Sequence, residues 1–112
     1  MTTALTVEPE RHADRLTLSL TGEMDIDSCS RVSDALDLDG CTSVVLDLAG
    51  LTFMDSSGVN LVLRLRQRLA PEGVHLALHG VQGQPRRLVT LVGLETVVEV
   101  EPAARTAQAW AP

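Results

Sequence analysis

Residues 43–60 read S-V-V-L-D-L-A-G-L-T-F-M-D-S-S-G-V-N and join two different hydrophobic patterns. The first six residues, Ser43 to Leu48, are almost all apolar, which is typical of a strand that is buried on both faces. From Val59 to Ala70, apolar residues recur instead at helical spacing. Between the two patterns lies D-S-S-G, and the side-chain oxygens of Asp and Ser bond readily to the free N–H groups of a first helical turn. The stretch therefore predicts a buried strand, a polar turn and a helix that begins at or beside the two serines.

Further patterns on both sides of this stretch predict the remaining elements. From Arg15 to Thr21, Leu16, Leu18 and Leu20 alternate with polar residues, as in a strand with one buried face. The other segments are a weaker strand at residues 3–8, a helix capped by Asp27 and Ser28, a strand at 74–79 with His75, Ala77 and His79 facing outward, a helix from Pro85 that ends at Gly93, and a strand at 95–100.

The order of these elements predicts an α/β fold. Strands that are joined by helical crossovers run parallel, whereas the first two strands are joined by a short polar link and form a hairpin. The sheet is therefore expected to be mixed. With 112 residues, the chain has room for a single domain, 1–112, whose core spans about residues 3–100 and is followed by an Ala-rich C-terminal tail at 102–112.

The composition excludes several classes of function. The net charge is −6 and the chain has one Phe, one Trp and no Tyr, so it lacks the positive patches and the stacking aromatic residues that bind nucleic acids. All nine basic residues are Arg, which excludes a P-loop lysine, a Schiff-base lysine and a lysine base for a serine hydrolase. We therefore expect no nucleic-acid partner and no enzyme of these classes.

The cysteines and the N-terminal sequence bear on cofactors and on localisation. Cys29 and Cys41 are not in a metal-ligand spacing, and Cys29 lies on the apolar side of its predicted helix. Glycine-rich phosphate loops are absent from the sequence. The first residues lack the features of a signal peptide, and no apolar run is long enough to span a membrane. We expect a cytoplasmic protein without a metal, a cofactor or direct membrane insertion.

Two acidic turns follow predicted strands. Glu23-Met24-Asp25 comes after the second strand, and Asp55-Ser56-Ser57-Gly58 comes a few residues after Leu48. In α/β sheets, functional groups gather at the carboxyl ends of the parallel strands. If the two turns are neighbours, they form a shallow acidic surface that carries hydroxyl groups, with no deep catalytic pocket.

These two turns resemble those of the STAS domain, specifically of the bacterial anti-sigma factor antagonists. The resemblance rests on G-E-M-D at 22–25 and on L-T-F-M-D-S-S-G at 51–58, and it extends from Leu5 to about Val100. It implies a small STAS-like domain in which the helices pack mainly on one face of the sheet. It also implies a phosphorylated regulator that is not itself an enzyme.

The family resemblance implies a partner-switching mechanism. The unphosphorylated antagonist binds an anti-sigma factor that is also a serine kinase, and this binding releases a sigma factor. The kinase phosphorylates the serine after the motif Asp, a serine phosphatase reverses the modification, and the ATP chemistry belongs to the kinase. The residues implied here are Ser56 as the phosphoacceptor, with Asp25, Asp55, Ser57, Gly58 and Asn60 in the phosphosite neighbourhood and in partner binding.

Asn60 departs from the pattern of the family, which often has a small residue, commonly Gly, at this position. The difference lies in the first turn of the predicted helix. We therefore expect Asn60 to change the fit of a partner more than the ability of the chain to fold.

Other readings of these residues remain open at this point. One alternative keeps the same fold and makes the chain a STAS scaffold subunit of a stressosome-like or transporter-associated complex without a phospho-switch. A second alternative makes Ser56 a helix cap without a chemical role, and Ser57 is read as the cap or a hydrogen-bonding neighbour. Arg64, Arg66 and Arg68 are read as a solvated helix face, with a possible role at the kinase interface.

An enzymatic reading has weaker support. His12, His75 and His79 invite a Ser-His-Asp hydrolase hypothesis, but the sequence has no G-x-S-x-G elbow. Asp25-Ile26-Asp27 resembles the D-x-D of the haloacid-dehalogenase phosphatases, whose chemistry also needs a Lys that this chain lacks. A helix-capping Asp27 and a surface Asp25 are the preferred reading.

Overall fold

The computed structural model describes residues 4–101, which form one small domain of five strands, three α-helices and two short 3₁₀ helices. The strands are β1 (Thr6–His12), β2 (Arg15–Met24), β3 (Ser43–Met54), β4 (His75–His79) and β5 (Glu99–Glu101). The helices are α1 (Cys29–Asp34), α2 (Ser56–Leu69) and α3 (Gly83–Val92), with 3₁₀ helices η1 (Ala70–Glu72) and η2 (Leu94–Thr96). The predicted tail at 102–112 lies outside the described residues.

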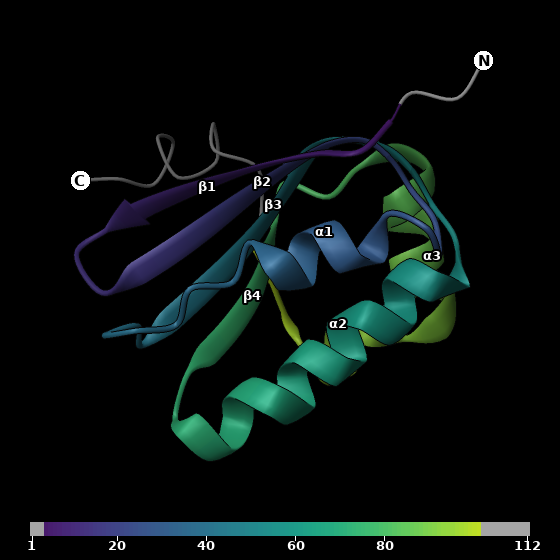
Figure 1. Cartoon of the computed structure of the whole chain (residues 1–112). Helices are drawn as coiled ribbons and strands as arrows, with labels where there is room; N and C mark the ends of the chain where they lie inside the picture. The colour runs from purple at the N-terminus through teal and green to yellow at the C-terminus, as the bar shows by residue number, and fades with distance from the viewer. Residues whose placement is uncertain (1–3, 102–112) are drawn as a thin grey trace, which may run out of the picture.

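The strands form one mixed sheet in the order β1-β2-β3-β4-β5 (Figure 1). β1 and β2 are antiparallel, and each later strand runs parallel to the one before it. The predicted α/β class and mixed sheet are therefore confirmed. No helix among residues 4–101 is both long enough and apolar enough to cross a membrane.

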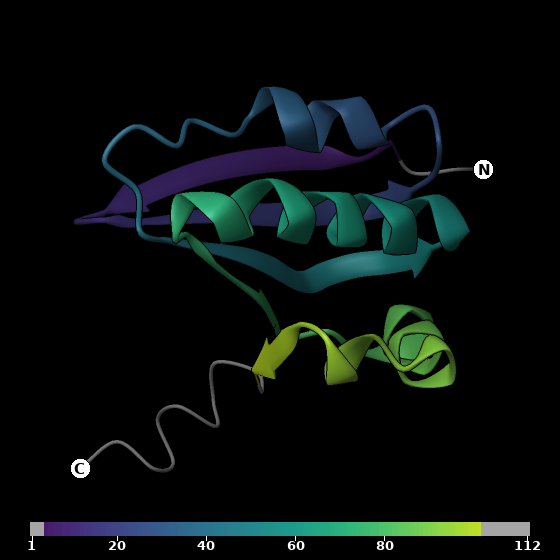
Figure 2. The ribbon, with the colours of Figure 1, turned by 90° about the horizontal axis from the view of Figure 1, so that it is seen from below.

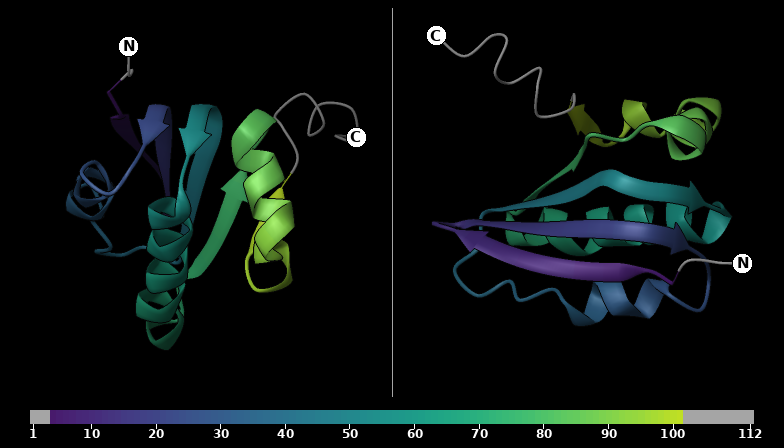
Figure 3. Two further views of the ribbon diagram at one scale, coloured as in Figure 1. Left: turned by 90° about the vertical axis from the view of Figure 1, so that its right-hand side faces the viewer. Right: turned by 90° about the horizontal axis from the view of Figure 1, so that it is seen from above.

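The core lies between the sheet and two helices. Helices α1 and α2 cover the same face of the sheet, whereas α3 lies beside the carboxyl-terminal part of β3 (Figures 2 and 3). The alternating leucines of β2 point toward the helices, and Leu18, Leu46 and Leu78 from three adjacent strands are fully buried. On α2, Val62, Leu65 and Leu69 supply the opposing apolar side chains, as the helical spacing predicts.

Both central strands extend further than predicted. β3 continues six residues beyond Leu48 to Met54, and β2 continues to Met24. The additional residues of β2 pair with those of β3. This backbone pairing extends both strands through a stretch whose side chains show no continuous apolar pattern, so the sequence did not predict it. As a result, both turns of the STAS-like motif begin directly at strand ends.

The two outer strands differ from the prediction. β1 is Thr6–His12, so it both begins and ends later in the chain than the predicted strand at 3–8. It pairs with β2 as far as a two-residue turn at Ala13 and Asp14. As an edge strand it is almost wholly exposed and has no alternating pattern to reveal it. β5 is only Glu99–Glu101, because residues 94–96 form η2 after the left-handed Gly93. Ala77, predicted to face outward, is buried between its neighbours Val45 and Glu99.

Candidate functional site

The two acidic turns lie side by side, so the condition set in the sequence analysis is met. Met24 and Met54 are paired residues at the ends of β2 and β3, and the Asp55 N–H donates to the Met24 carbonyl at 3.4 Å. Both turns lie at the carboxyl ends of these strands, at the opposite end of the sheet from the β1–β2 hairpin (Figure 1). The chain therefore brings Asp25, Asp55 and Ser56 to one edge of the domain.

A glycine bulge directs the first turn. Gly22 has φ of 102°, a backbone conformation that disfavours any side chain, and the β2–β3 register shifts on both sides of it. The Thr52 hydroxyl donates to the Gly22 carbonyl at 3.0 Å and holds this irregular segment against β3. The glycine of G-E-M-D thus has a structural role in placing Asp25.

Asp25 organises the turn that leads into α1. Its Oδ1 accepts the N–H groups of Asp27 and Ser28, each at 3.1 Å, while the Ser28 hydroxyl oxygen accepts the Asp25 N–H at 2.9 Å. Ser28 is the N-terminal cap residue by position, but its side chain makes no capping bond to the helix. The predicted capping by Asp27 is wrong, because α1 begins at Cys29 with Ser28 at the cap position, and the exposed Asp27 carboxylate forms no hydrogen bond with the helix among residues 4–101.

Asp55 caps the second helix. Its backbone is extended, and its Oδ1 accepts the Ser57 N–H at 2.9 Å, the standard arrangement of an N-terminal cap. Neither serine is the cap: Ser56 is the first residue of α2 and Ser57 the second. Ser56 is exposed, and among residues 4–101 no side chain or backbone group forms a hydrogen bond with its hydroxyl.

Gly58 allows α2 to approach the two strand ends. A Cβ at this position would lie 2.8 Å from the Met54 sulfur and 2.9 Å from the Met24 sulfur, and it would also overlap Met54 Cγ. Both methionines are fully buried, so they have little room to move. The glycine of D-S-S-G is therefore needed for close packing beneath the phosphosite predicted from the sequence.

Three exposed residues of α2 share one side of the helix. Ser56, Asn60 and Arg64 are spaced by four residues, and all three are exposed. A partner that contacts Ser56 along this side would meet Asn60 next. Arg66 differs from its neighbours, because its Nε donates to the Val97 carbonyl at 2.8 Å.

Cys29 lies between the two acidic turns and beneath the start of α2. It is buried, as predicted, and its thiol lies 3.6 Å from the Ser57 carbonyl. Burial raises the pKa of the Cys29 thiol, and the negative charges of Asp55 and Asp25 raise it further, whereas Arg64 opposes the shift. This thiol is therefore held in its neutral form and responds to the charges of the site.

Sequence reasoning missed three features of this site. Ile26 and Phe53, apolar residues on the two motif turns, are 75% and 40% exposed. Gln84 of α3 forms two hydrogen bonds with the backbone of Met54, the residue before Asp55. No local pattern distinguishes a glutamine that bonds a strand 30 residues away, so only the fold reveals this contact.

The surface of the site is shallow. A pocket of about 240 Å³ adjoins the Asp25 turn and does not include Ser56. Its lining consists of Ala4, Leu5, Glu23, Asp25, Asp27, Ser28 and Arg31. Among residues 4–101, no group of three or more His, Cys, Asp and Glu residues is arranged to hold a metal ion.

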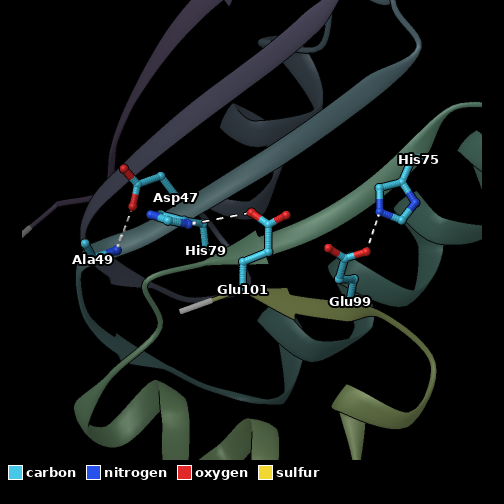
Figure 4. Close-up of polar contacts among 6 residues, drawn as sticks. All are labelled: Asp47, Ala49, His75, His79, Glu99 and Glu101. Atoms are coloured by element: carbon cyan, nitrogen blue, oxygen red, sulfur yellow. Dashed lines mark hydrogen bonds and ion pairs between the residues drawn. The ribbon is translucent and has the colours of Figure 1, made fainter. Parts of the chain in front are cut away.

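The three histidines lie away from Ser56. His75 and His79 are on the helix-free face of the sheet, where His75 lies 2.9 Å from Glu99 and His79 lies 3.7 Å from Glu101 (Figure 4). His12 ends β1 at the hairpin, at the other end of the sheet. None of them is arranged as a base for Ser56, so the geometry does not support a Ser-His-Asp hydrolase.

The chain is similar to known regulators over most of its length. The family model described as "Mlab, STAS domain" matches residues 7–99. An anti-sigma F factor antagonist from Paenibacillus polymyxa is 30% identical over 100 residues, which are 86% of this chain and 86% of that protein.

Solved structures share the fold. The crystal structure of an anti-sigma factor antagonist from Mycobacterium paratuberculosis aligns with a TM-score of 0.79 at 22% identity, over 95% of this chain and 92% of that one. The anti-sigma factor antagonist SpoIIAA in its unphosphorylated form aligns with a TM-score of 0.73 at 23% identity, over 95% and 93% of the two chains. The phosphorylated form of Bacillus SpoIIAA aligns with a TM-score of 0.65 at 23% identity, over 97% and 100%.

Proposed function

The chain belongs to the STAS domain family, and from this premise we propose that it is an anti-sigma factor antagonist that is controlled by phosphorylation of Ser56. The observation that carries the proposal is the position of Ser56. It is the exposed first residue of α2, directly after the capping Asp55 and beside the Asp25 turn. A kinase can reach this hydroxyl without opening the fold.

The unphosphorylated protein binds an anti-sigma factor that is also a serine kinase, and this binding frees a sigma factor. The kinase transfers phosphate from ATP to Ser56, and a serine phosphatase restores the hydroxyl. The protein itself works without catalysis, in the cytoplasm, as a substrate and a binding partner. The relatives support this assignment: one is named an anti-sigma F factor antagonist, and another has been solved in a phosphorylated form.

The electrostatics of the site favour a switch that acts on the interface more than on the fold. A phosphoserine carries a charge of about −1.5 to −2 at neutral pH. The N-terminal end of the α2 dipole stabilises it by about 0.3–1 kcal/mol, while the neighbouring Asp55 and Asp25 carboxylates oppose it. These opposing effects leave the stability of the isolated domain almost unchanged.

At a docked interface the same charge has a large effect. A buried charge without a partner costs several kcal/mol, and about 1.4 kcal/mol corresponds to a tenfold change in affinity. The exposed side chains of Ile26 and Phe53 lie on the two motif turns and supply apolar contact area for the partner beside Ser56. Phosphate at Ser56 therefore disrupts binding by desolvation and by charge, with no change of conformation in the antagonist.

A binding experiment with matched substitutions tests this function. The anti-sigma factor kinases of the host are purified and titrated with the wild-type chain, Ser56→Asp and Ser57→Asp. We expect Ser56→Asp to abolish binding to the cognate kinase and the half-buried Ser57→Asp to retain more of it. Equal, undiminished binding of both variants would contradict the switch and support the scaffold alternative, in which binding does not depend on the charge at Ser56.

A further inference from the structure

β3 has an edge that its neighbouring strand does not cover. The pairing of β3 with β4 ends at Asp47 and His79, whereas β3 itself continues to Met54. After His79 the chain turns at Gly80, which has φ of 72°, and leads into α3. Within residues 4–101, the last part of β3, which delivers Asp55 and Ser56, therefore has β2 on one side and no strand on the other.

Two glutamine side chains occupy the place of the missing strand. The Gln84 Oε1 accepts the Met54 N–H at 2.9 Å, and the Gln84 Nε2 donates to the Met54 carbonyl at 2.9 Å. A neighbouring strand would supply the same two bonds. Further back along β3, the Gln82 Nε2 donates to the Ala49 carbonyl at 2.9 Å. α3 and its N-cap residue Gln82 thus hold β3 at two points, of which only the Gln84 contact adjoins the acceptor serine.

Met54 is the residue through which this contact acts on the site. It directly precedes Asp55, the cap of α2, and its side chain packs against Gly58 in the first turn of the helix. Gln84 holds both backbone polar groups of Met54 on one edge. On the other edge, the Asp55 N–H donates to the Met24 carbonyl of β2 at 3.4 Å. Together these bonds define the path of the chain into Ser56.

We propose that Gln84 is a positioning residue for the phospho-switch: its amide, bonded to both backbone groups of Met54, fixes the turn that presents Ser56 to the kinase. The inference rests on the proposed function. It adds that the rate of phosphorylation depends on a residue of α3, 28 positions after the acceptor and separate from the motif turns.

Gln84→Met tests the proposal, because Met has a similar shape but cannot form either hydrogen bond. Gln82→Met is the matched control, since it removes a contact of the same kind at Ala49. Phosphorylation of Ser56 by the cognate kinase is measured as kcat and KM, and hydrogen exchange of the Met54 amide is followed by NMR. We expect Gln84→Met to speed exchange at Met54, to shift the Ser56 and Ser57 amide resonances and to lower kcat/KM about threefold to tenfold, mainly through kcat.

The Gln82→Met control distinguishes loss of the positioning of Ser56 from a general loss of domain stability. Gln82→Met should leave kcat/KM within about twofold of wild type, even where it lowers the melting temperature as much as Gln84→Met does. The proposal is overturned if Gln84→Met leaves Met54 exchange unchanged, or if it speeds exchange but leaves kcat/KM at the level of the control. A wild-type chain that is never phosphorylated on Ser56 would instead overturn the proposed function, and this inference with it.

Discussion

At the scale of single residues, Asp55 has two separable roles. Its carboxylate caps α2 through the Ser57 N–H, and its charge contributes to the electrostatics around Ser56 and Cys29. Asn caps helices as well as Asp but carries no charge. The pair of substitutions Asp55→Ala and Asp55→Asn therefore distinguishes the structural role from the electrostatic one.

We predict that Asp55→Ala lowers the free energy of unfolding by about 1 kcal/mol, while Asp55→Asn changes it by less than about half of that. For a domain of this size, the loss corresponds to a fall in melting temperature of about 4–8 °C. Thermal unfolding followed by circular dichroism measures both. Equal destabilisation by the two substitutions would show that the charge, and not the cap, provides the stability.

Cys29 serves as a reporter of the charges at the site. Burial, Asp55 and Asp25 raise the pKa of its thiol above its ordinary value. In a Cys41→Ala background, we predict that the pH profile for alkylation of Cys29 in the folded protein lies at higher pH than that of the unfolded chain, and that Asp55→Asn moves this profile to lower pH. An unchanged alkylation profile in Asp55→Asn would show that the carboxylate does not act on the thiol.

The same shift affects stability at high pH. Because the pKa of Cys29 is higher in the folded than in the unfolded chain, the folded state binds its proton more tightly. The resulting stabilisation is complete below the unfolded pKa and is lost as the pH rises through the folded value. We expect the alkaline fall in melting temperature to be smaller in Cys29→Ala, measured against Cys41→Ala as the control.

At the scale of elements, the contact between α2 and the ends of β2 and β3 depends on Gly58. We predict that Gly58→Ala lowers the free energy of unfolding by about 1–3 kcal/mol, although Ala is the better helix former, because its Cβ would overlap Met54 and approach Met24 too closely. Asn60→Ala, at an exposed position of the same turn, is the control and should stay within about 0.5 kcal/mol of wild type. A stabilised Gly58→Ala would contradict this packing.

Elements with a periodic pattern of buried side chains were predicted well from the sequence, whereas elements whose position depends on contacts with other segments were not. The leucine alternation of β2 and the helical spacing of α2 predicted both elements, because burial imposes a period on the side chains. β1 and β5 were misplaced because their positions depend on pairing with a neighbour and on the turns at Ala13 and Gly93. The adjacency of the two acidic turns followed from parallel topology, whereas the contact from Gln84 depends on where α3 docks.

At the scale of the whole molecule, the domain presents the exposed Ser56 hydroxyl at one end of its sheet. The site lies at one end of the sheet, and the pairs of His75 and His79 with Glu99 and Glu101 lie on the helix-free face (Figure 4). We therefore predict that Ser56→Asp keeps the fold: its melting temperature should stay within about 2–4 °C of wild type, since surface substitutions change stability little. A large fall in melting temperature would mean that the charge acts on the fold and not on the interface.

The central claim is that Ser56 accepts the phosphate, and intact-mass spectrometry tests it most directly. The protein is purified from its own host across growth and stress conditions, and peptides that cover Phe53 to Arg64 are mapped. We predict a fraction that is heavier by one phosphate, localised to Ser56, lost on phosphatase treatment and absent from Ser56→Ala. A chain that remains unmodified in every condition, and also after incubation with host extract and ATP, would contradict the claim and favour a scaffold without a phospho-switch.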